Sequence, residues 1–488
     1  MFKLIKAPTM EQFGPYLGEL GFQVTDDNQI RGIHDNKFFD YFYSESDDLN
    51  NRRKETVHEA VREIIASTLA KYDIVPVHVV GTQTYMNKPE APHVTLLATA
   101  IGKLAEKKDV IVVIGEAGGG SSGQDAGIWA YRSLMREGGL EKGSAVGLTE
   151  MLRKMGKELK VEGDEEGKKA EAGVVILNPG ALLYSHKEKK AMTQTSWMGR
   201  QKKDSLTAGY EVDEKWNKVA MHTTATEHIK TVLAHVLPKH LNKKARVHIL
   251  CVGESAKDTI DYLDDLFTKN PDDKDLAAKL QSIVLIEPIH KHEELQSAKF
   301  KYFLRKRGIA FVESETVPVS GLVATPDKTE ERKMGDSWVK VDNNASDSNN
   351  EAAIQDRIDS IVAKTTDLDP ADDNDAPPAP VSTHTYSASD LDHTTELIVP
   401  EILNRALGYI SRHMSSREDF LNNDADGKVD EVIDKLSEDF DKTQRLYPDI
   451  MNPIIQAARD EYEEEGKEDW AMSLMLDMES LQRSPEKQ

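Results

Sequence analysis

The most constraining feature of the sequence is a series of short apolar segments that are separated by helical patterns. The segment DVIVVI at 109–114 is apolar without alternation, which indicates a strand buried on both faces of a parallel sheet. In 51–71, apolar residues recur at three-to-four spacing, as on one face of an amphipathic helix. Alternating strands and helices of this kind predict an α/β fold with a doubly wound, mostly parallel sheet and right-handed crossovers.

The predicted elements cover most of the first two thirds of the chain. Strands are predicted at 74–80, 93–99, 109–114, 172–180, 245–253, 282–287 and 308–313. Further helices are predicted at 126–137, 144–160, 223–240, 292–307 and directly after Ser255.

The composition changes near residue 326. From 326 to 393 the chain is rich in Asp, Ser, Asn, Thr and Pro, and such a segment buries too little apolar surface to offset the entropy of ordering. Residues beyond it combine many acidic side chains with helical spacing of apolar ones. We therefore predict an α/β domain over 1–325, a disordered acidic linker over 326–393 and an acidic helical C-terminal region over 394–488.

Charge and composition exclude several classes of protein. The formal net charge of -23 argues against bulk binding of duplex DNA, which requires a basic face. Cys251 is the one cysteine, so no internal disulfide can form. The sequence shows neither a signal peptide nor a stretch of about 18 apolar residues, so we expect a soluble intracellular protein without a membrane partner. Composition does not decide between nucleus and cytoplasm.

The segment ILCVGESAKDT at 249–259 resembles the serine turn of a hydrolase. In α/β-hydrolases the nucleophilic serine lies on a tight turn between a strand and a helix, next to small residues. Gly253 and Ala256 are small, but Lys257 stands where the second glycine of the motif belongs. Ser255 is therefore either a nucleophile in a degenerate turn or a residue near the start of an ordinary helix.

A glycine-rich loop, GEAGGGSSGQDAG at 115–127, follows a predicted central strand. Backbone amides of Gly118, Gly119 and Gly120 could stabilise an oxyanion or hold another anion before the next helix. The loop lacks the lysine of a P-loop and the spacing of a dinucleotide fingerprint. A flexible surface loop without a ligand is the alternative.

A serine nucleophile also needs a base, which follows the last strand in this fold. No histidine occurs between residues 293 and 383, and His384, His393 and His413 lie in or beyond the predicted linker. His290 and His292, just after the strand that ends at Glu287, are the remaining candidates, although a surface or hydrogen-bonded structural histidine is the more common interpretation. Loss of a triad histidine lowers turnover about a millionfold, which favours a protein that is not an enzyme.

Two basic stretches interrupt the acidic background, at 185–203 and 299–308. Each mixes cations with aromatic residues, as a contact with single-stranded RNA requires. In the second stretch the aromatic residues also fit a core position, with the cations on the solvated face. The candidate RNA-binding residues are Lys189, Lys190, Arg200, Lys202, Arg305 and Arg307.

Residues 422–433, NNDADGKVDEVI, imitate a calcium-binding loop. The twelfth position of such a loop carries a bidentate glutamate, and here it is Ile433. We therefore predict an acidic loop between helices, with no metal site and no cofactor in the protein.

The ordered series of these segments resembles the argonaute-binding protein two (Arb-two) domain family. The resemblance begins at FGPYLGELGFQV and continues through VIVVIGEAGGGSSGQDAGIW, where Gly127 and Trp129 match the exit of the family's glycine loop. GVVILNPG at 173–180, FLRKRGIAFVESE at 303–315 and the Glu227–His228 pair that opens a helix match later segments. The similarity extends from about residue 13 to 340.

The resemblance implies an α/β-hydrolase-like scaffold that is used for interaction in small-RNA silencing and heterochromatin formation. Argonaute or other silencing-complex proteins are the implied partners, small RNA is a further candidate, and the nucleus is favoured over the cytoplasm. The family's turn reads His-Ser-Tyr-Gly-Gly, whereas residues 254–258 read ESAKD, and the family's late histidine falls at about Thr329.

Three hypotheses follow. The first is a non-catalytic module that binds silencing partners. The second is a serine hydrolase that acts through Ser255. The third is a scaffold whose acidic C-terminal region recruits a basic partner.

Overall fold

The architecture was obtained from a computed structural model of the full chain. It describes residues 11–118, 124–158, 171–201, 211–269, 276–314, 317, 322–324, 383–389 and 395–414.

The central feature of the fold is a ten-stranded sheet with the order β13-β14-β12-β11-β10-β6-β7-β5-β3-β4. The strands from β14 to β7 in this order run parallel, whereas β5, β3, β4 and β13 form antiparallel pairs. The strands are β3 (Ile74–Val80), β4 (Gln83–Tyr85), β5 (Val94–Thr99), β6 (Asp109–Ile114), β7 (Gly173–Leu177), β10 (Arg246–Val252), β11 (Leu280–Ile286), β12 (Gly308–Glu313), β13 (Leu322–Ala324) and β14 (His384–Ser389).

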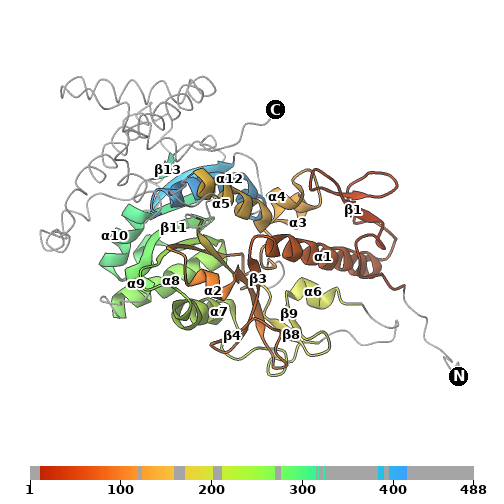
Figure 1. The fold of residues 1–488 in the computed structure, drawn as a ribbon, viewed down its shortest axis with the longest axis horizontal. Helices are drawn as coiled ribbons and strands as arrows, with labels where there is room; N and C mark the ends of the chain where they lie inside the picture. Colours follow the sequence, from red (N-terminus) through yellow and green to blue (C-terminus); the bar gives the residue numbers. More distant parts are fainter. Residues whose placement is uncertain are drawn as a thin grey trace, which may run out of the picture.

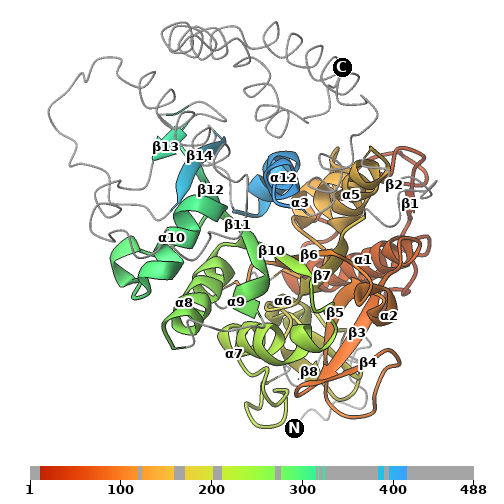
Figure 2. The same cartoon turned by 60° about the vertical axis from the view of Figure 1, so that its left-hand side comes forward.

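Helices cover both faces of this sheet (Figures 1 and 2). One face packs against α1 (Asp47–Ala70), α5 (Ala145–Glu158) and α12 (Thr395–Ser411), with the short helices α3 (Tyr131–Leu134) and α4 (Gly139–Gly143) beside them. The other face packs against α7 (Ala225–Thr231), which continues as η1 (Val232–Val236) and η2 (Leu237–Lys239), and against α2 (Ile101–Leu104), α8 (Glu254–Lys269), α9 (Leu276–Lys279) and α10 (Ala298–Arg307).

Alternation along the buried strands produces these two cores. In β6, Ile111 and Val113 join the first core, while Val110, Val112 and Ile114 join the second. Successive side chains of a strand point to opposite faces, so a strand that is apolar throughout must be covered on both sides. The prediction of an α/β fold with a mostly parallel, doubly wound sheet is confirmed.

Two hairpins and two short helical segments lie outside this sheet. The hairpin of β1 (Phe22–Val24) and β2 (Ile30–Gly32) precedes α1. The hairpin of β8 (Leu183–Ser185) and β9 (Lys190–Met192) follows β7 and leads into α6 (Gln194–Met198). A 3-10 turn, η3 (His292–Glu294), precedes α10.

The last strand and the last described helix differ from the predicted domain boundaries. β14 lies within the expected linker of 326–393, yet it pairs in parallel with β12. α12 lies within the expected separate region of 394–488, yet it belongs to the first core of the α/β domain. β14 reads HTYSAS, so it lacks the apolar run that marks the other strands. Its small Ser387 and Ala388 are nevertheless fully buried.

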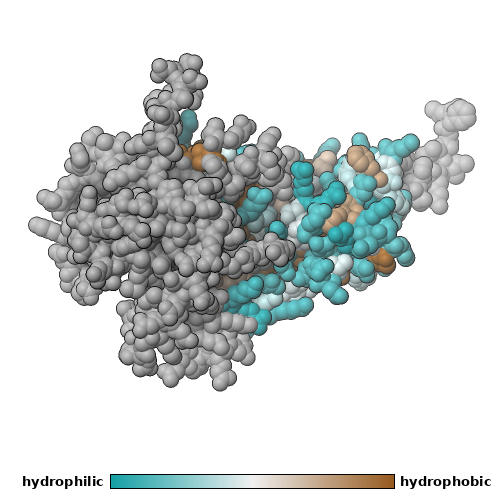
Figure 3. All heavy atoms as spheres, turned by 90° about the horizontal axis from the view of Figure 1, so that it is seen from above, coloured by the Kyte–Doolittle hydropathy of each residue, from teal (hydrophilic) through white to brown (hydrophobic). Residues whose placement is uncertain are grey.

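None of the described helices combines the length and the apolar character needed to span a bilayer. In the view of Figure 3, the described part of the surface is mostly hydrophilic, with hydrophobic residues scattered among hydrophilic ones.

Candidate functional site

The turn between β10 and α8 has the geometry of a nucleophile elbow, but its central residue is a glycine. β10 ends at Val252 and α8 begins at Glu254, so Gly253 alone makes the turn, with a positive φ of 57°. In α/β-hydrolases the nucleophile itself occupies this strained turn position. Gly253 therefore holds the place of the nucleophilic side chain and offers none.

Ser255 lies two residues beyond the turn, in the first turn of α8. The serine is fully buried, and its Oγ has no hydrogen-bond partner among the described residues. Its carbonyl oxygen accepts a hydrogen bond of 2.7 Å from Thr259 Oγ1 within the helix. A small side chain at this point lets the helix pack closely on the strand, which is the role of the second small residue in the elbow motif.

The carboxylate of Glu116 fills the space beside Gly253. Glu116 follows β6 in the glycine-rich loop, and a Cβ atom added to Gly253 would overlap this carboxylate. Glu116 Oε1 accepts hydrogen bonds from the backbone N–H groups of Glu254, at 3.3 Å, and of Gly118, at 3.2 Å. In hydrolases the amide after the nucleophile and an amide from this type of loop form the oxyanion hole. An internal carboxylate therefore occupies both donors.

Burial raises the pKa of the Glu116 carboxyl above its ordinary value, although the hydrogen bonds from Gly118 and Glu254 oppose this shift. The loop around it is fixed by Gln124. Gln124 Oε1 accepts the N–H of Glu116 at 3.0 Å, and Gln124 Nε2 donates to the carbonyl oxygen of Trp129 at 2.6 Å. Gly118 has a positive φ of 62°, while Gly119 and Gly120 lie outside the described residues.

His290 does not bond to Ser255. Its Nδ1 is buried without a hydrogen-bond partner among the described residues, and burial lowers its pKa to about 4. His384 begins β14, and His413 lies just past the end of α12. His393 lies outside the described residues.

Carboxylates gather at the edge of the sheet where Gly253 lies. Glu287 follows β11 with a positive φ of 49°, and its side chain accepts the backbone N–H of Glu313 at the end of β12. Burial raises the pKa of the Glu287 carboxyl. Among the described residues, no group of three potential metal ligands is close enough together to hold a metal ion.

A second group of residues, which sequence patterns did not indicate, contains the hydrogen-bonded serine, histidine and aspartate that the elbow turn lacks. His248 on β10 lies between Ser282 on β11 and Asp109 on β6, with His248 Nδ1 2.9 Å from Ser282 Oγ and His248 Nε2 3.2 Å from Asp109 Oδ1. Ser282 and His248 are fully buried and Asp109 is 3% exposed. These residues come from three neighbouring strands far apart in the sequence, so no local motif could have revealed them.

Two further residues that the family resemblance singled out have structural roles. Gly127 has a positive φ of 77°, and a Cβ there would lie 2.9 Å from Leu97 Cδ1. Trp129 is 1% exposed in the first core. Both residues therefore fix the exit of the glycine-rich loop against the sheet.

His228, at the start of α7, forms a buried relay with His222. His222 Nε2 donates to the carbonyl oxygen of Gly81 at 2.8 Å, so its Nδ1 accepts from His228 Nδ1 at 2.9 Å. His228 Nε2 in turn accepts the N–H of Asn178 at 3.4 Å. This pattern requires both rings to be neutral, and burial lowers the pKa of each. The neighbouring Glu227 accepts hydrogen bonds from Thr223.

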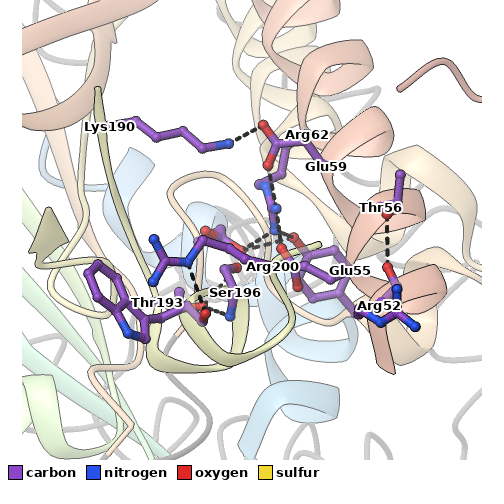
Figure 4. A network of polar contacts seen from close by, with 12 residues as sticks. Arg52, Glu55, Thr56, Glu59, Arg62, Lys190, Thr193, Ser196 and Arg200 are labelled. Carbon is purple, nitrogen blue, oxygen red and sulfur yellow. Dashed lines mark hydrogen bonds and ion pairs between the residues drawn. The ribbon is translucent and has the colours of Figure 1, made fainter. Parts of the chain in front are cut away.

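A polar network connects α1 to the loop exit and to β9 (Figure 4). Arg62 donates to Glu55 at 2.5 Å, to Glu59 at 2.6 Å and to Asp125 at 2.9 Å. Lys190 forms an ion pair with Glu59 from the opposite side. These cations lower the pKa of Glu59 to about 2, although burial acts in the other direction. The network therefore positions the loop and holds Lys190 in place.

The other residues of the first basic stretch differ in exposure. Lys189 is exposed at the hairpin turn and pairs with Glu90 at 2.8 Å. Arg200 is buried, stacks over Trp197 at 3.7 Å and donates to Ser185 Oγ. Lys202 lies outside the described residues. Lys189 is thus available at the surface, whereas Arg200 supports the packing of α6.

The second basic stretch forms α10. Phe300 and Leu304 are fully buried in the second core, and Tyr302 is 50% exposed. Arg305 is half-buried and Arg307 is exposed at the end of the helix. The imitated calcium loop at 422–433 lies outside the described residues.

The sheet and the elbow turn define an α/β-hydrolase-like protein with a glycine at the nucleophile position. The model of the Arb2 domain matches residues 13–317, more than half of the 488 residues, so the chain belongs to the Arb2 domain family. No curated protein matches the chain. The structure adds β14 and α12 to the same fold, beyond the end of the matched segment.

Proposed function

We propose that this protein is a non-catalytic, α/β-hydrolase-like interaction module that acts in argonaute-linked, small-RNA-directed heterochromatin formation and gene silencing. Its partners are argonaute or other silencing-complex proteins together with small RNA, and its site of action is the nucleus. Membership of the Arb2 domain family supports the silencing context. The absence of catalysis is supported by one observation at the elbow.

That observation is the pairing of Gly253 with Glu116. Acyl transfer by this fold needs a nucleophile on the turn and free amides for the oxyanion. Gly253 supplies no side chain, and Glu116 accepts the N–H groups of Glu254 and Gly118 that would bind the oxyanion. A substrate carbonyl would have to displace the half-buried Glu116 carboxylate and would still meet no hydroxyl.

The alternative of a serine hydrolase assigns the chemistry to Ser255. Its hydroxyl is fully buried and has no described base within hydrogen-bond reach. A base must lie about 2.6–3.2 Å from the proton that it accepts. The geometry therefore favours the interaction module over the hydrolase.

Labelling with a fluorophosphonate probe tests the absence of catalysis. We expect the purified chain to remain unlabelled, and Ser255→Ala to behave like the natural chain. Labelling that disappears in Ser255→Ala would establish the hydrolase instead. An active serine hydrolase, labelled in the same experiment, controls for the probe.

Crosslinking tests the silencing role. Argonaute and small RNA should be recovered with the full-length protein from nuclear extracts. Crosslinks to RNA are expected near 185–203 or 299–308, and charge reversal of Lys189 or Arg307 should weaken them. RNA crosslinks that do not respond to these substitutions would remove both stretches as RNA contacts.

A further inference from the structure

A solvent-exposed tryptophan stands beside the tip of the β8–β9 hairpin. Trp216 is 64% exposed, whereas Trp129 and Trp197 are 1% and 3% exposed. A large apolar ring in water is unfavourable by roughly 25 cal/mol for each Å² of exposed apolar surface. Its exposure therefore distinguishes it from these two buried tryptophans.

The backbone of Trp216 is held by hydrogen bonds on both sides. Its backbone N–H donates to Asp213 Oδ1 at 3.0 Å, and its carbonyl oxygen accepts from His186 Nε2 at 2.8 Å. The adjacent Asn217 is buried and donates to the carbonyl oxygen of Tyr184 at 3.1 Å. The tryptophan is thus fixed to β8 before any ligand arrives.

An aromatic ladder supports one face of the indole. Trp216 stacks on His186 with centroids 4.4 Å apart and planes 26° apart. His186 contacts Tyr184, which is 1% exposed and in turn contacts the buried His93. One face of the indole is therefore covered from within the protein, and the large exposed fraction leaves the remaining surface open to a partner.

Charged residues flank both stacked rings in the sequence, with Lys187 and Glu188 after His186 and Glu214 and Lys215 before Trp216. Lys187 and Lys215 are exposed, and among the described residues neither side chain has an ion pair. Lys189 is exposed beside Lys187 and pairs with Glu90 through solvent-accessible side chains. Glu214, the nearest acid in sequence, pairs with Lys218 at 3.9 Å, and Asp213 is engaged by the backbone N–H groups of the turn. A protein anchor would sit in apolar surroundings, whereas a ring among lysines fits a base with its phosphates.

We propose that His186, Lys187, Lys189, Lys215 and Trp216 form a stacking platform for an unpaired base of single-stranded RNA, with the lysines at the flanking phosphates. This deepens the proposed function and rests on its RNA component. Every base has a π-face, so the platform should accept any sequence. A paired duplex buries its base faces and should bind only through the lysines.

Fluorescence anisotropy with the full chain tests the platform, with a labelled 12-nucleotide single-stranded RNA and a blunt RNA duplex as probes. Trp216→Ala should weaken binding of the single strand about 5- to 150-fold, which corresponds to the loss of one stacked base, and should barely change duplex binding. Trp216→Phe should retain part of the affinity. Lys187→Glu with Lys215→Glu should weaken both probes and reduce the salt dependence.

The matched control is Phe42→Ala. Phe42 is also exposed, at 78%, and lies outside both basic stretches. Unchanged affinity in Phe42→Ala together with a loss in Trp216→Ala supports the platform, and the reverse pattern overturns it.

The two proposals fail in different ways. RNA binding that survives Trp216→Ala removes the platform and leaves the RNA component of the proposed function intact. A natural chain that binds neither probe removes both. If Trp216→Ala instead abolishes argonaute capture while RNA binding is unchanged, the ring is a protein contact and the platform is overturned. Circular dichroism of each variant verifies that the fold is kept.

Discussion

The elbow turn and the buried Ser282–His248–Asp109 group each have a part of a hydrolase site that the other lacks. The elbow has the position of a hydrolase site, with a tight turn and two inward amides, but it has no nucleophile and its amides are occupied by Glu116. The buried group has serine, histidine and aspartate in hydrogen-bond order, but no access for a substrate. The chemical groups of a catalytic site and its position in the fold therefore occur apart in this molecule.

Helix α12 is what closes off the buried group. His248 alternates on β10 with Leu250 and Val252, which pack in the first core with α12. His413, just after α12, lies close enough to His248 for the charge of one to affect the other. Removal of α12 is thus the most severe test of the comparison.

Truncation after residue 382 should unfold the domain. It removes β14 and the buried side chains of α12, each of which contributes about 1.5–3 kcal/mol when aliphatic and fully buried. Their sum approaches or exceeds the roughly 5–15 kcal/mol of a typical domain. The buried aliphatic residues of α12 are Ile398, Val399, Ile402, Leu403, Leu407 and Ile410. Thermal melting followed by circular dichroism measures the loss.

The matched control is truncation after Met414, which keeps every described residue and should retain a cooperative transition. A folded 1–382 fragment that a fluorophosphonate labels at Ser282 would break the comparison. The buried group would then be an active site that α12 merely covers.

Acid should destabilise the protein well before its carboxylates are protonated. Burial lowers the pKa of His413 to about 3 and that of His290 to about 4, against an ordinary value of 6.5. The unfolded chain therefore takes up protons first, so this contribution is complete above pH 6.5 and is lost as the pH falls toward the folded values. Each unit of pKa difference corresponds to about 1.4 kcal/mol.

Urea denaturation between pH 7.5 and 4 measures this dependence. His413→Gln should flatten the profile by removing one contribution beside the buried group, and His290→Gln should do the same at the edge that carries the elbow. A slope that neither substitution changes would contradict these assignments. The variant that flattens the profile more identifies the region whose buried histidine contributes more to the pH dependence of stability.

Asp109→Ala should cost about 1–3 kcal/mol of folding free energy, because it leaves the buried His248 Nε2 without its acceptor. Urea denaturation measures the loss, and Asp109→Asn should recover part of it. Ser255→Ala is the contrasting variant: among the described residues its hydroxyl has no hydrogen-bond partner, so its removal should change stability by less than about 0.5 kcal/mol. Equal losses in the two variants would mean that the two regions are not distinguished by their hydrogen bonding.

Gly253→Ala should destabilise the protein by about 1–3 kcal/mol, since a side chain at this φ is strained and its Cβ meets Glu116. Glu116→Ala should remove the collision, so the double variant should lose less than the sum of the single variants by about 0.5–3 kcal/mol. Additive losses would show that Glu116 does not fill the place of the nucleophile. Folding free energies from urea denaturation complete the cycle.

Most of the sheet could be predicted from the sequence because burial on both faces leaves a strong local signal. The segments 74–80, 109–114 and 308–313 form strands with the predicted bounds. β14 escaped prediction because its residues are small and polar and follow an acidic stretch. The resemblance to the Arb-two family was confirmed, since it depended on an ordered series of segments rather than on one motif.

The site was harder to predict for two physical reasons. Backbone conformation determines which residue makes the elbow turn. Glycine adopts a positive φ more readily than other residues, so Gly253, directly after the strand, was the sequence signal for this turn. The contacts of Glu116 with Gly253, of His248 with Ser282 and of Trp216 with His186 join distant segments. Periodicity and spacing report local structure, so long-range contacts of this kind leave no trace in them.

The pairing of β14 with β12 also has a consequence for synthesis of the chain. Residues 314–383 must be translated after β12 before its partner strand exists, and α12 follows later still. At roughly 5–20 residues per second, these residues take ~4–14 s to synthesise, during which the edge of β12 stays free, and the core stays uncovered for longer because α12 comes later. During this interval a chaperone or a second nascent chain would compete with β14 for the edge of β12. The edge is protected from aggregation only after β14 has been synthesised and has paired with it.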